Sequence, residues 1–208
     1  MSPQNAEATR LDPASHALNP LPADACEDAL WPALGARARA ADIAASDDLY
    51  GWLIGSWALE VLHYRTNMRT DMRAAPMKAE AHFGRVLGGR AIQDVWIFPA
   101  RSEWQGRTRD TQAAGPLGYG TTLRVWDAAL RAWRVTWIDP VDGQRSELIG
   151  RRVGNDIVQI GTRTDGTPIR WNFTDITADT FRWTGASLDV DGVTWKVGGD
   201  FVATRMRG

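Results

Sequence analysis

The sequence is poor in residues that hold metals or cross-link chains. It has one cysteine, Cys26, so no disulfide can form within the chain. Its three histidines are His16, His63 and His82, and no group of cysteine and histidine has the spacing of a zinc site. The chain also lacks a phosphate-binding loop, a dinucleotide-binding glycine fingerprint and a nucleophile elbow. We therefore expect neither a metal nor a nucleotide cofactor.

Long hydrophobic runs and an excess of one charge are absent as well. No segment approaches the roughly 20 apolar residues of a membrane helix, and no secretory signal is recognisable near the N-terminus. The 24 basic and 25 acidic side chains give a net charge of −1, which argues against a nucleic-acid partner. The single cysteine and the missing signal favour a cytoplasmic location.

Tryptophan, by contrast, is abundant. The chain has 11 tryptophans beside 5 phenylalanines and 3 tyrosines. Each tryptophan brings a large apolar surface and one N–H group that usually finds a partner when it is buried. So many in one small protein indicate either a strongly aromatic core or a cavity lined with rings.

Composition divides the chain into three parts. Residues 1–22 are rich in Pro, Ala, Ser and Asn without periodicity, which predicts a flexible tail. Residues 23–50 are rich in alanine with spaced apolar side chains, which predicts a short helical segment. From residue 51 to residue 208, short runs of β-branched and aromatic residues alternate with glycine-containing turns, as expected of one β-domain.

The β-domain contains ten candidate strands. They lie near residues 55–65, 77–87, 90–98, 119–126, 132–138, 145–151, 156–162, 168–174, 179–187 and 192–204. Turn dipeptides separate several of them, namely Gly88-Gly89, Asp142-Gly143, Asp165-Gly166 and Asp191-Gly192. Successive hairpins form an up-and-down meander, and closure removes its free edges. We therefore predict a mainly β fold, an antiparallel barrel of about ten strands with a short helical N-terminal extension.

Turn lengths predict which side chains share a face. If Asp165-Gly166 is a two-residue turn, Ile160 lies opposite Trp171 and Val158 lies opposite Phe173. We expect this face to be the inner wall of a cavity. Ile169 shares this wall, and if Gly154-Asn155 is the preceding turn, the wall also includes Glu147, Ile149 and Arg151.

Other strands contribute further candidates for the cavity. The Gly88-Gly89 turn places Phe83 opposite Asp94, with Trp96 on the same face, although periodicity does not decide whether that face is inside. Taken together, the predicted ligand-binding residues are Trp96, Arg124, Trp137, Ile149, Arg151, Val158, Ile160, Trp171, Phe173 and Trp183.

Several ordered motifs carry a family resemblance. The barrel begins Gly55-Ser56-Trp57, and His82-Phe83-Gly84, a Gly89–Trp96 run and an Asp165–Trp171 run follow. Over roughly residues 48–205 the chain resembles bacterial lipocalin-like (calycin) domains of unassigned function, and is more distantly similar to nitrobindin and fatty-acid-binding barrels. The resemblance implies that Trp57 plugs one end of the barrel.

Two details of the resemblance concern arginine and histidine. In lipocalins an arginine from the last strand lies across the matching tryptophan, a part that Arg205 or Arg207 would take here. Nitrobindin-like barrels hold haem through a histidine near the C-terminus. This chain has no histidine after His82, which argues against haem, so the expected set of cofactors is empty.

Asp94 is the first of three candidates for acid–base chemistry. Aspartate is disfavoured in strands, so its place among apolar residues calls for a reason. It is either a cavity carboxylate that acts as a general acid or base, or the partner of Arg85 or Arg124.

His63 and Glu147 are the other two candidates. If Trp57 points inward, the two-residue period of a strand turns His63 inward too. His63 is then either an acid–base group or a hydrogen-bonded histidine at the barrel end. Glu147 offers the same choice, with Arg151 as its structural partner.

These observations leave three functional hypotheses open. The first is a protein that binds a small, largely apolar molecule such as a polyene, terpenoid or polyketide in its barrel. The second is a cofactor-independent biosynthetic enzyme, such as a cyclase, isomerase or hydro-lyase, that uses Asp94, His63 or Glu147. The third is an interaction domain whose barrel is simply filled. A homodimer is also compatible with the sequence.

Overall fold

The computed structural model describes residues 27–64, 77–104, 118–140 and 143–207. The chain divides into two compact units, residues 1–33 and 34–208, each considered by itself. The predicted tail, residues 1–22, lies outside the described residues. Helix α1 (Glu27–Leu34) accounts for the described part of the first unit and ends at the start of the second. None of the described helices is long and apolar enough to span a membrane.

The second unit consists mainly of ten long strands. Their bounds are β2 Gly55–Tyr64, β3 Met77–Val86, β4 Ala91–Phe98, β5 Gly118–Asp127, β6 Ala132–Asp139, β7 Gln144–Val153, β8 Asp156–Arg163, β9 Pro168–Thr174, β10 Thr180–Leu188 and β11 Trp195–Arg205. The smaller elements are strand β1 (Gly35–Ala36) and the 3-10 turns η1 (Ala45–Asp47), η2 (Gly51–Leu53), η3 (Leu87–Gly89) and η4 (Arg101–Trp104). The predicted strands agree with these in number and order.

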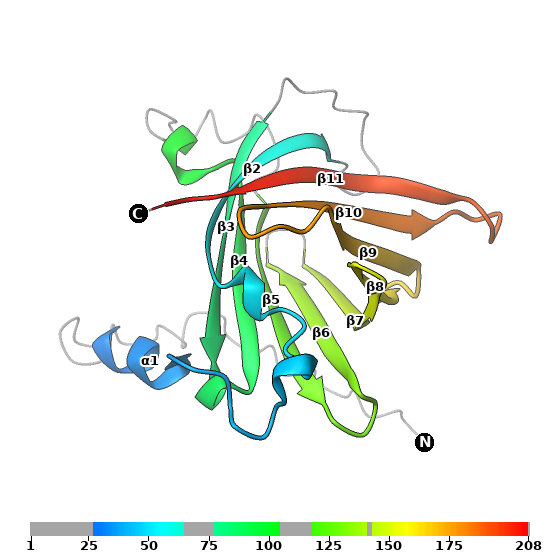
Figure 1. Ribbon diagram of the computed structural model, residues 1–208. Helices are drawn as coiled ribbons and strands as arrows, with labels where there is room; N and C mark the ends of the chain where they lie inside the picture. The colour runs from blue at the N-terminus through cyan, green and yellow to red at the C-terminus, as the bar shows by residue number, and fades with distance from the viewer. Residues whose placement is uncertain (1–26, 65–76, 105–117, 141–142, 208) are drawn as a thin grey trace, which may run out of the picture. The chain divides into compact units, whose positions relative to one another are not determined.

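The ten long strands close into a barrel (Figure 1). From β3 to β11 each strand pairs antiparallel with the next one in sequence, and β11 pairs with β2. Closure is completed at β3, which pairs with both β2 and β4. The short β1 adds to the end of β3, where Gly35 lies opposite Val86. The predicted mainly β, up-and-down barrel is confirmed.

The predicted inner wall of β7 and β8 is wrong. Arg163 and Thr167 close a three-residue loop, in which Arg163 N–H donates to Thr167 O at 3.0 Å and Gly166 adopts a φ of +81°. The extra loop residue places Ile160 opposite Arg170 instead of Trp171. Ile160 is consequently 57% exposed. A one-residue change of register inverts a whole strand face.

This inversion extends to β7, because the pairing of β7 with β8 is the predicted one, Ile149 opposite Ile160. The outward face therefore includes Glu147, Ile149, Arg151 and Val158 together with Ile160. The inward face of β8 carries Ile157 and Gln159, both fully buried. On β9 the prediction is correct, since Ile169 and Phe173 are buried inside the barrel.

His63 also points away from the interior, contrary to its predicted direction. A bulge in the β2–β11 pairing adds one residue between Val61, opposite Phe201, and His63, opposite Asp200. Asp200 lies on the outer face, where its carboxylate accepts bonds of 2.8 and 2.6 Å from Arg182. Tyr64, the next residue, takes the inward place and packs against the core.

The turns before β2 fill and close one end of the barrel. Tyr50 and Leu53 are completely buried there, and Trp57 Nε1 donates to the carbonyl oxygen of Leu53 at 2.8 Å. The Arg205 guanidinium lies 4.1 Å from the centre of the Trp57 ring and donates to the carbonyl oxygens of Trp52 and Ile54 at 2.7 and 2.8 Å. The predicted arginine across Trp57 is thus present, and it is Arg205.

On the outer surface, a polar cluster joins η4 to β3. Glu80 accepts a 2.5 Å bond from Arg101 Nε and lies 3.3 Å from His82 Nε2. His82 Nδ1 lies 2.8 Å from Ser56 Oγ on the neighbouring strand β2. Although burial alone would raise the pKa of Glu80, hydrogen bonds and charge from Arg101 outweigh it and hold the pKa below its usual 4.5. The fold therefore favours the ionised carboxylate.

Replacing Glu80 with glutamine should lower the melting temperature at pH 7 and change it little at pH 3. A lowered pKa in the folded state stabilises the protein above the unfolded-state pKa, and this stabilisation disappears as the pH falls through the folded-state value. Thermal unfolding of the wild type and Glu80→Gln from pH 7 to pH 3 checks this. Glu60→Gln, at an exposed site on β2, is the control. A difference that stays constant across this range would contradict the assignment.

Candidate functional site

Aromatic side chains occupy the barrel interior in two groups. At the closed end, rings pack edge to face and leave little room, with centroids 4.7–6.2 Å apart in the cluster of Tyr50, Trp52, Trp57, Trp133, Phe173 and Phe181. The N–H groups of Trp57 and Trp133 both donate to backbone carbonyls at 2.8 Å. This half is a conventional core.

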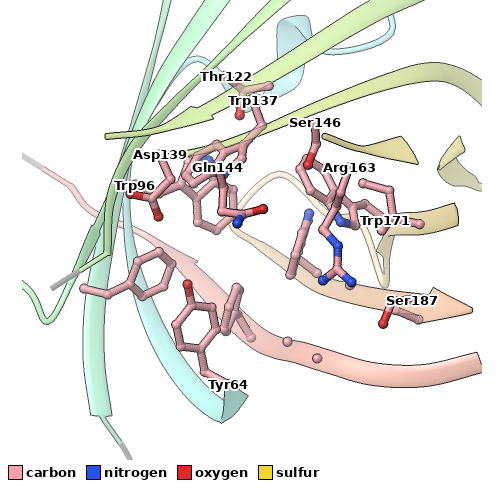
Figure 2. Close-up of a pocket in the computed structure, with 18 of the residues that line it drawn as sticks. Tyr64, Trp96, Thr122, Trp137, Asp139, Gln144, Ser146, Arg163, Trp171 and Ser187 are labelled. Carbon is pink, nitrogen blue, oxygen red and sulfur yellow. The ribbon is translucent and has the colours of Figure 1, made fainter. Parts of the chain in front are cut away.

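The other half of the barrel contains a pocket of about 170 Å³, partly open to solvent (Figure 2). Its aromatic lining consists of Tyr64, Trp96, Phe98, Trp137, Trp171, Trp183 and Phe201. Its polar lining consists of Thr122, Arg124, Asp139, Gln144, Ser146, Arg163 and Ser187, and the remainder is Ile169, Gly185, Ala186, Gly198 and Gly199. Apolar walls with a few polar groups are typical of small-molecule sites.

The rings of the pocket support one another. Trp183 stacks on Phe201 with centroids 5.0 Å apart and an interplanar angle of 5°, and its ring centre lies 5.7 Å from that of Trp171. Glycines make room for two of these rings. A Cβ atom at Gly120 would lie 2.3 Å from the Trp137 ring, and one at Gly185 would lie 2.5 Å from Trp183. Larger residues at these two positions would displace the walls.

Asp94 and Arg124 form a buried ion pair at the inner end of the pocket. Arg124 Nη1 donates to Asp94 Oδ2, and Asp94 Oδ1 accepts a 2.7 Å bond from the backbone N–H of Thr122. The side chain of Asp94 is fully buried and that of Arg124 is 2% exposed. Of the two partners foreseen for Asp94, the structure therefore selects Arg124. Arg85 instead pairs with Asp48 at 2.5 Å.

The ion pair rests on the core beneath it. The Arg124 guanidinium carbon lies 5.0 Å from the Tyr50 ring centre, and the Tyr50 hydroxyl donates to Gln159 Oε1 at 3.0 Å. Burial raises the pKa of Tyr50 far above its usual value, although the charge of Arg124 opposes the shift. Tyr50 therefore stays protonated and keeps its donor role. Gly150 allows this contact, since a Cβ there would lie 2.0 Å from the Tyr50 oxygen.

Arg163 is the cation near the mouth of the pocket. It is the last residue of β8, lies opposite Ser146 of β7 and lines the pocket. Its Nε atom is buried and has no hydrogen-bond partner among the described residues. Arg163 forms an ion pair with Asp165, in which 3.7 Å separates Arg163 Nε from Asp165 Oδ1. In Figure 2 its guanidinium lies between Ser146 and Ser187, beside Trp171.

The structure brings five of the ten predicted ligand-binding residues to this pocket, namely Trp96, Arg124, Trp137, Trp171 and Trp183. Phe173 also points inward but belongs to the closed end, where it packs on Tyr50. The other four, Ile149, Arg151, Val158 and Ile160, lie on the outer face described above.

The three acid–base candidates do not meet in the pocket. Asp94 is held by Arg124, and His63 lies outside beside Asp200. Glu147 is 51% exposed on the outer face, where it accepts bonds from Thr136 and Arg145 at 2.9 and 3.0 Å. Within the described ranges, no group of three His, Cys, Asp or Glu side chains could hold a metal ion. The enzyme hypothesis therefore lacks its proposed acid–base group.

Sequence reasoning missed most of the polar lining. Arg163, Asp139 and Ser146 occupy inward positions near strand ends, where alternation depends on the loop length. Reading Thr164-Asp165-Gly166 as a three-residue loop places Gln159, Gly161 and Arg163 inside. With that loop length the strand alternation places Arg163 inside, whereas the alternation alone does not decide between the two faces.

Comparisons with known proteins give no assignment for this site. No protein-family model matches the chain, and no curated protein is significantly similar to it. The fold and the site are therefore described by their own geometry, which is that of a ten-stranded antiparallel barrel compatible with a calycin-like fold.

Proposed function

We propose that this protein binds a small, largely apolar, ring-containing molecule in the aromatic pocket. The observation that carries the proposal is the contrast between the two halves of the barrel. Rings fill the closed end, whereas rings at the other end surround about 170 Å³ of open space. Flat aromatic walls favour unsaturated or aromatic ligands through stacking and edge-to-face contacts. A barrel that served only as a filled scaffold would not need this space.

The volume limits the size of the enclosed part of the ligand. A cavity of about 150 Å³ in another protein accommodates benzene, whereas drug-sized ligands use roughly 300–1,000 Å³. The pocket of about 170 Å³ therefore suits one or two rings. An extended polyene or a large polyketide would protrude through the mouth. Within the ligand classes expected from the sequence, we favour a compact ring system.

We also propose that the chain is a divergent calycin-like protein. The support is the Gly55-Ser56-Trp57 start, the sequential barrel and Arg205 lying 4.1 Å from the Trp57 ring centre. These three features lie at the closed end of the barrel and in its strand order, and none of them belongs to the pocket. The choice of ligand depends on the pocket alone, because one fold serves many functions.

Isothermal titration with naphthalene-2-carboxamide, a neutral two-ring probe, tests the binding proposal. The wild type should bind one molecule, and Trp171→Ala should weaken binding roughly tenfold or more, because one stacking wall is lost. Trp195→Ala is the matched control, since Trp195 lies outside the pocket and stacks on Arg170 with 5.0 Å between guanidinium carbon and ring centre. No binding at millimolar concentration, or equal losses in both variants, would overturn the proposal.

A further inference from the structure

We infer that the ligand carries an anionic group, such as a carboxylate, that Arg163 binds at the mouth of the pocket. This inference rests on the proposed function and specifies its ligand class. Arg163 is one of two guanidinium groups that line the pocket. The two differ in how their charge is compensated.

The charge of Arg124 is already compensated. Its guanidinium bonds to the fully buried Asp94 carboxylate, which also accepts the Thr122 N–H. Opposite charges in direct contact inside a protein leave little net field for a ligand, and separating a buried pair is costly. The charge of Arg124 is therefore compensated within the protein, although its Nε atom, like that of Arg163, is buried without a hydrogen-bond partner among the described residues.

The charge of Arg163 is compensated far less. Its side chain is 30% exposed, while its partner Asp165 is 56% exposed and 3.7 Å away, beyond hydrogen-bond distance. A solvent-exposed pair of this length contributes little. The buried Nε atom keeps an unused donor, although buried polar groups in proteins are usually hydrogen-bonded. Because solvent does not reach Nε itself, a ligand carboxylate would bind the terminal nitrogens of the 30% exposed Arg163 side chain.

The surroundings of Arg163 suit an anion. Ser146 lies directly opposite it on β7, so one hydroxyl group neighbours the arginine, and Ser187 on β10 lines the same pocket (Figure 2). Trp171, beside it, offers a ring surface for the apolar part of the same molecule. Asp139, the acidic side chain of the pocket, comes from β6 and lies across the pocket from Arg163 in Figure 2.

The experiment compares naphthalene-2-carboxylate with naphthalene-2-carboxamide, which has the same rings without the charge. The wild type should bind the carboxylate roughly 10- to 100-fold more tightly than the amide, as expected of a hydrogen bond to a charged group. Arg163→Gln should abolish this preference by weakening carboxylate binding far more than amide binding, which should remain measurable. Arg145→Gln, which removes the same charge from a 65% exposed position on the outer face of β7, should keep it.

The outcomes separate the two proposals. If both probes bind equally, or if Arg163→Gln keeps the preference for carboxylate, the inference is overturned while binding in the aromatic pocket stands. If neither probe binds to the wild type, the proposed function and the inference fall together. Retained amide binding in Arg163→Gln also shows that this variant is folded.

Discussion

Replacing Asp94 with asparagine should lower the free energy of unfolding by about 3–5 kcal/mol, because the variant leaves a buried guanidinium without its counter-charge. Asparagine has the size of aspartate and can still accept the Thr122 N–H, so packing and the backbone contact are preserved. What it removes is the negative charge beside Arg124, whose side chain is 2% exposed. Urea unfolding at pH 7 measures the difference.

A double variant distinguishes the charge from the geometry. Asp94→Leu combined with Arg124→Met removes both charges, and buried pairs replaced by apolar residues of similar volume are often neutral in stability. We expect it to be more stable than Asp94→Asn. Asp127→Asn is the control, because its partner Arg134 is 59% exposed and such a pair contributes about 0–1 kcal/mol. A loss below about 1 kcal/mol in Asp94→Asn would show that the pair is not a structural element of the barrel.

Replacing Trp57 with alanine should also cost about 3–5 kcal/mol, as expected for removing a fully buried aromatic ring from a packed core. The ring contacts Trp52 and Phe181 edge to face, with centroids 6.2 and 4.7 Å away. Its loss also leaves the Arg205 guanidinium without the ring that it covers. The closed end would thereby lose the side chain that joins β2, the preceding turn η2 and β11.

Two further variants make this prediction specific. Trp57→Phe keeps a ring but loses the N–H bond to the Leu53 carbonyl, so it should cost less than the alanine variant. Leu62→Ala, at a 52% exposed position on the same strand, should change stability by no more than about 0.5 kcal/mol. If Trp57→Ala and Leu62→Ala lose similar stability under urea, the proposed plug is not a core element.

The frame of the barrel was predictable because its signals are local. Each strand is a short run of apolar and β-branched residues and glycine turns separate several of them, so the succession of ten strands defines the strand order. The Gly88-Gly89 hairpin illustrates this, since the predicted pairing of Phe83 with Asp94 is present. The plug was predictable for a different reason, namely the resemblance carried by the motif at Trp57.

The candidate site was less predictable because it depends on single residues. One extra loop residue near Asp165 turns Ile160 out and Arg163 in, and one bulge near Leu62 turns His63 out and Tyr64 in. Periodicity cannot detect such shifts, since the same apolar pattern fits either face when both carry apolar residues. Composition likewise does not reveal that the rings divide into a packed closed end and an open pocket, because a count of 11 tryptophans does not distinguish filled space from open space.

The indole N–H signals of the tryptophans provide the most direct test of where a ligand binds. The chain has 11 tryptophans, and each contributes one indole signal to a ¹H–¹⁵N correlation spectrum. Four of them, Trp96, Trp137, Trp171 and Trp183, line the pocket. Trp57 and Trp133 belong to the closed end, where their N–H groups bond to backbone carbonyls. Substituting single tryptophans assigns the signals.

Titration with naphthalene-2-carboxylate should therefore shift the signals of the four pocket tryptophans and leave those of Trp57, Trp133 and the outer Trp195 in place. Ring currents from a stacked naphthalene act over short distances, so the pattern reports the position of the probe. Shifts confined to Trp195 or to the closed end, or a spectrum unchanged at saturating probe, would contradict the account that the open half of this barrel is a ligand site.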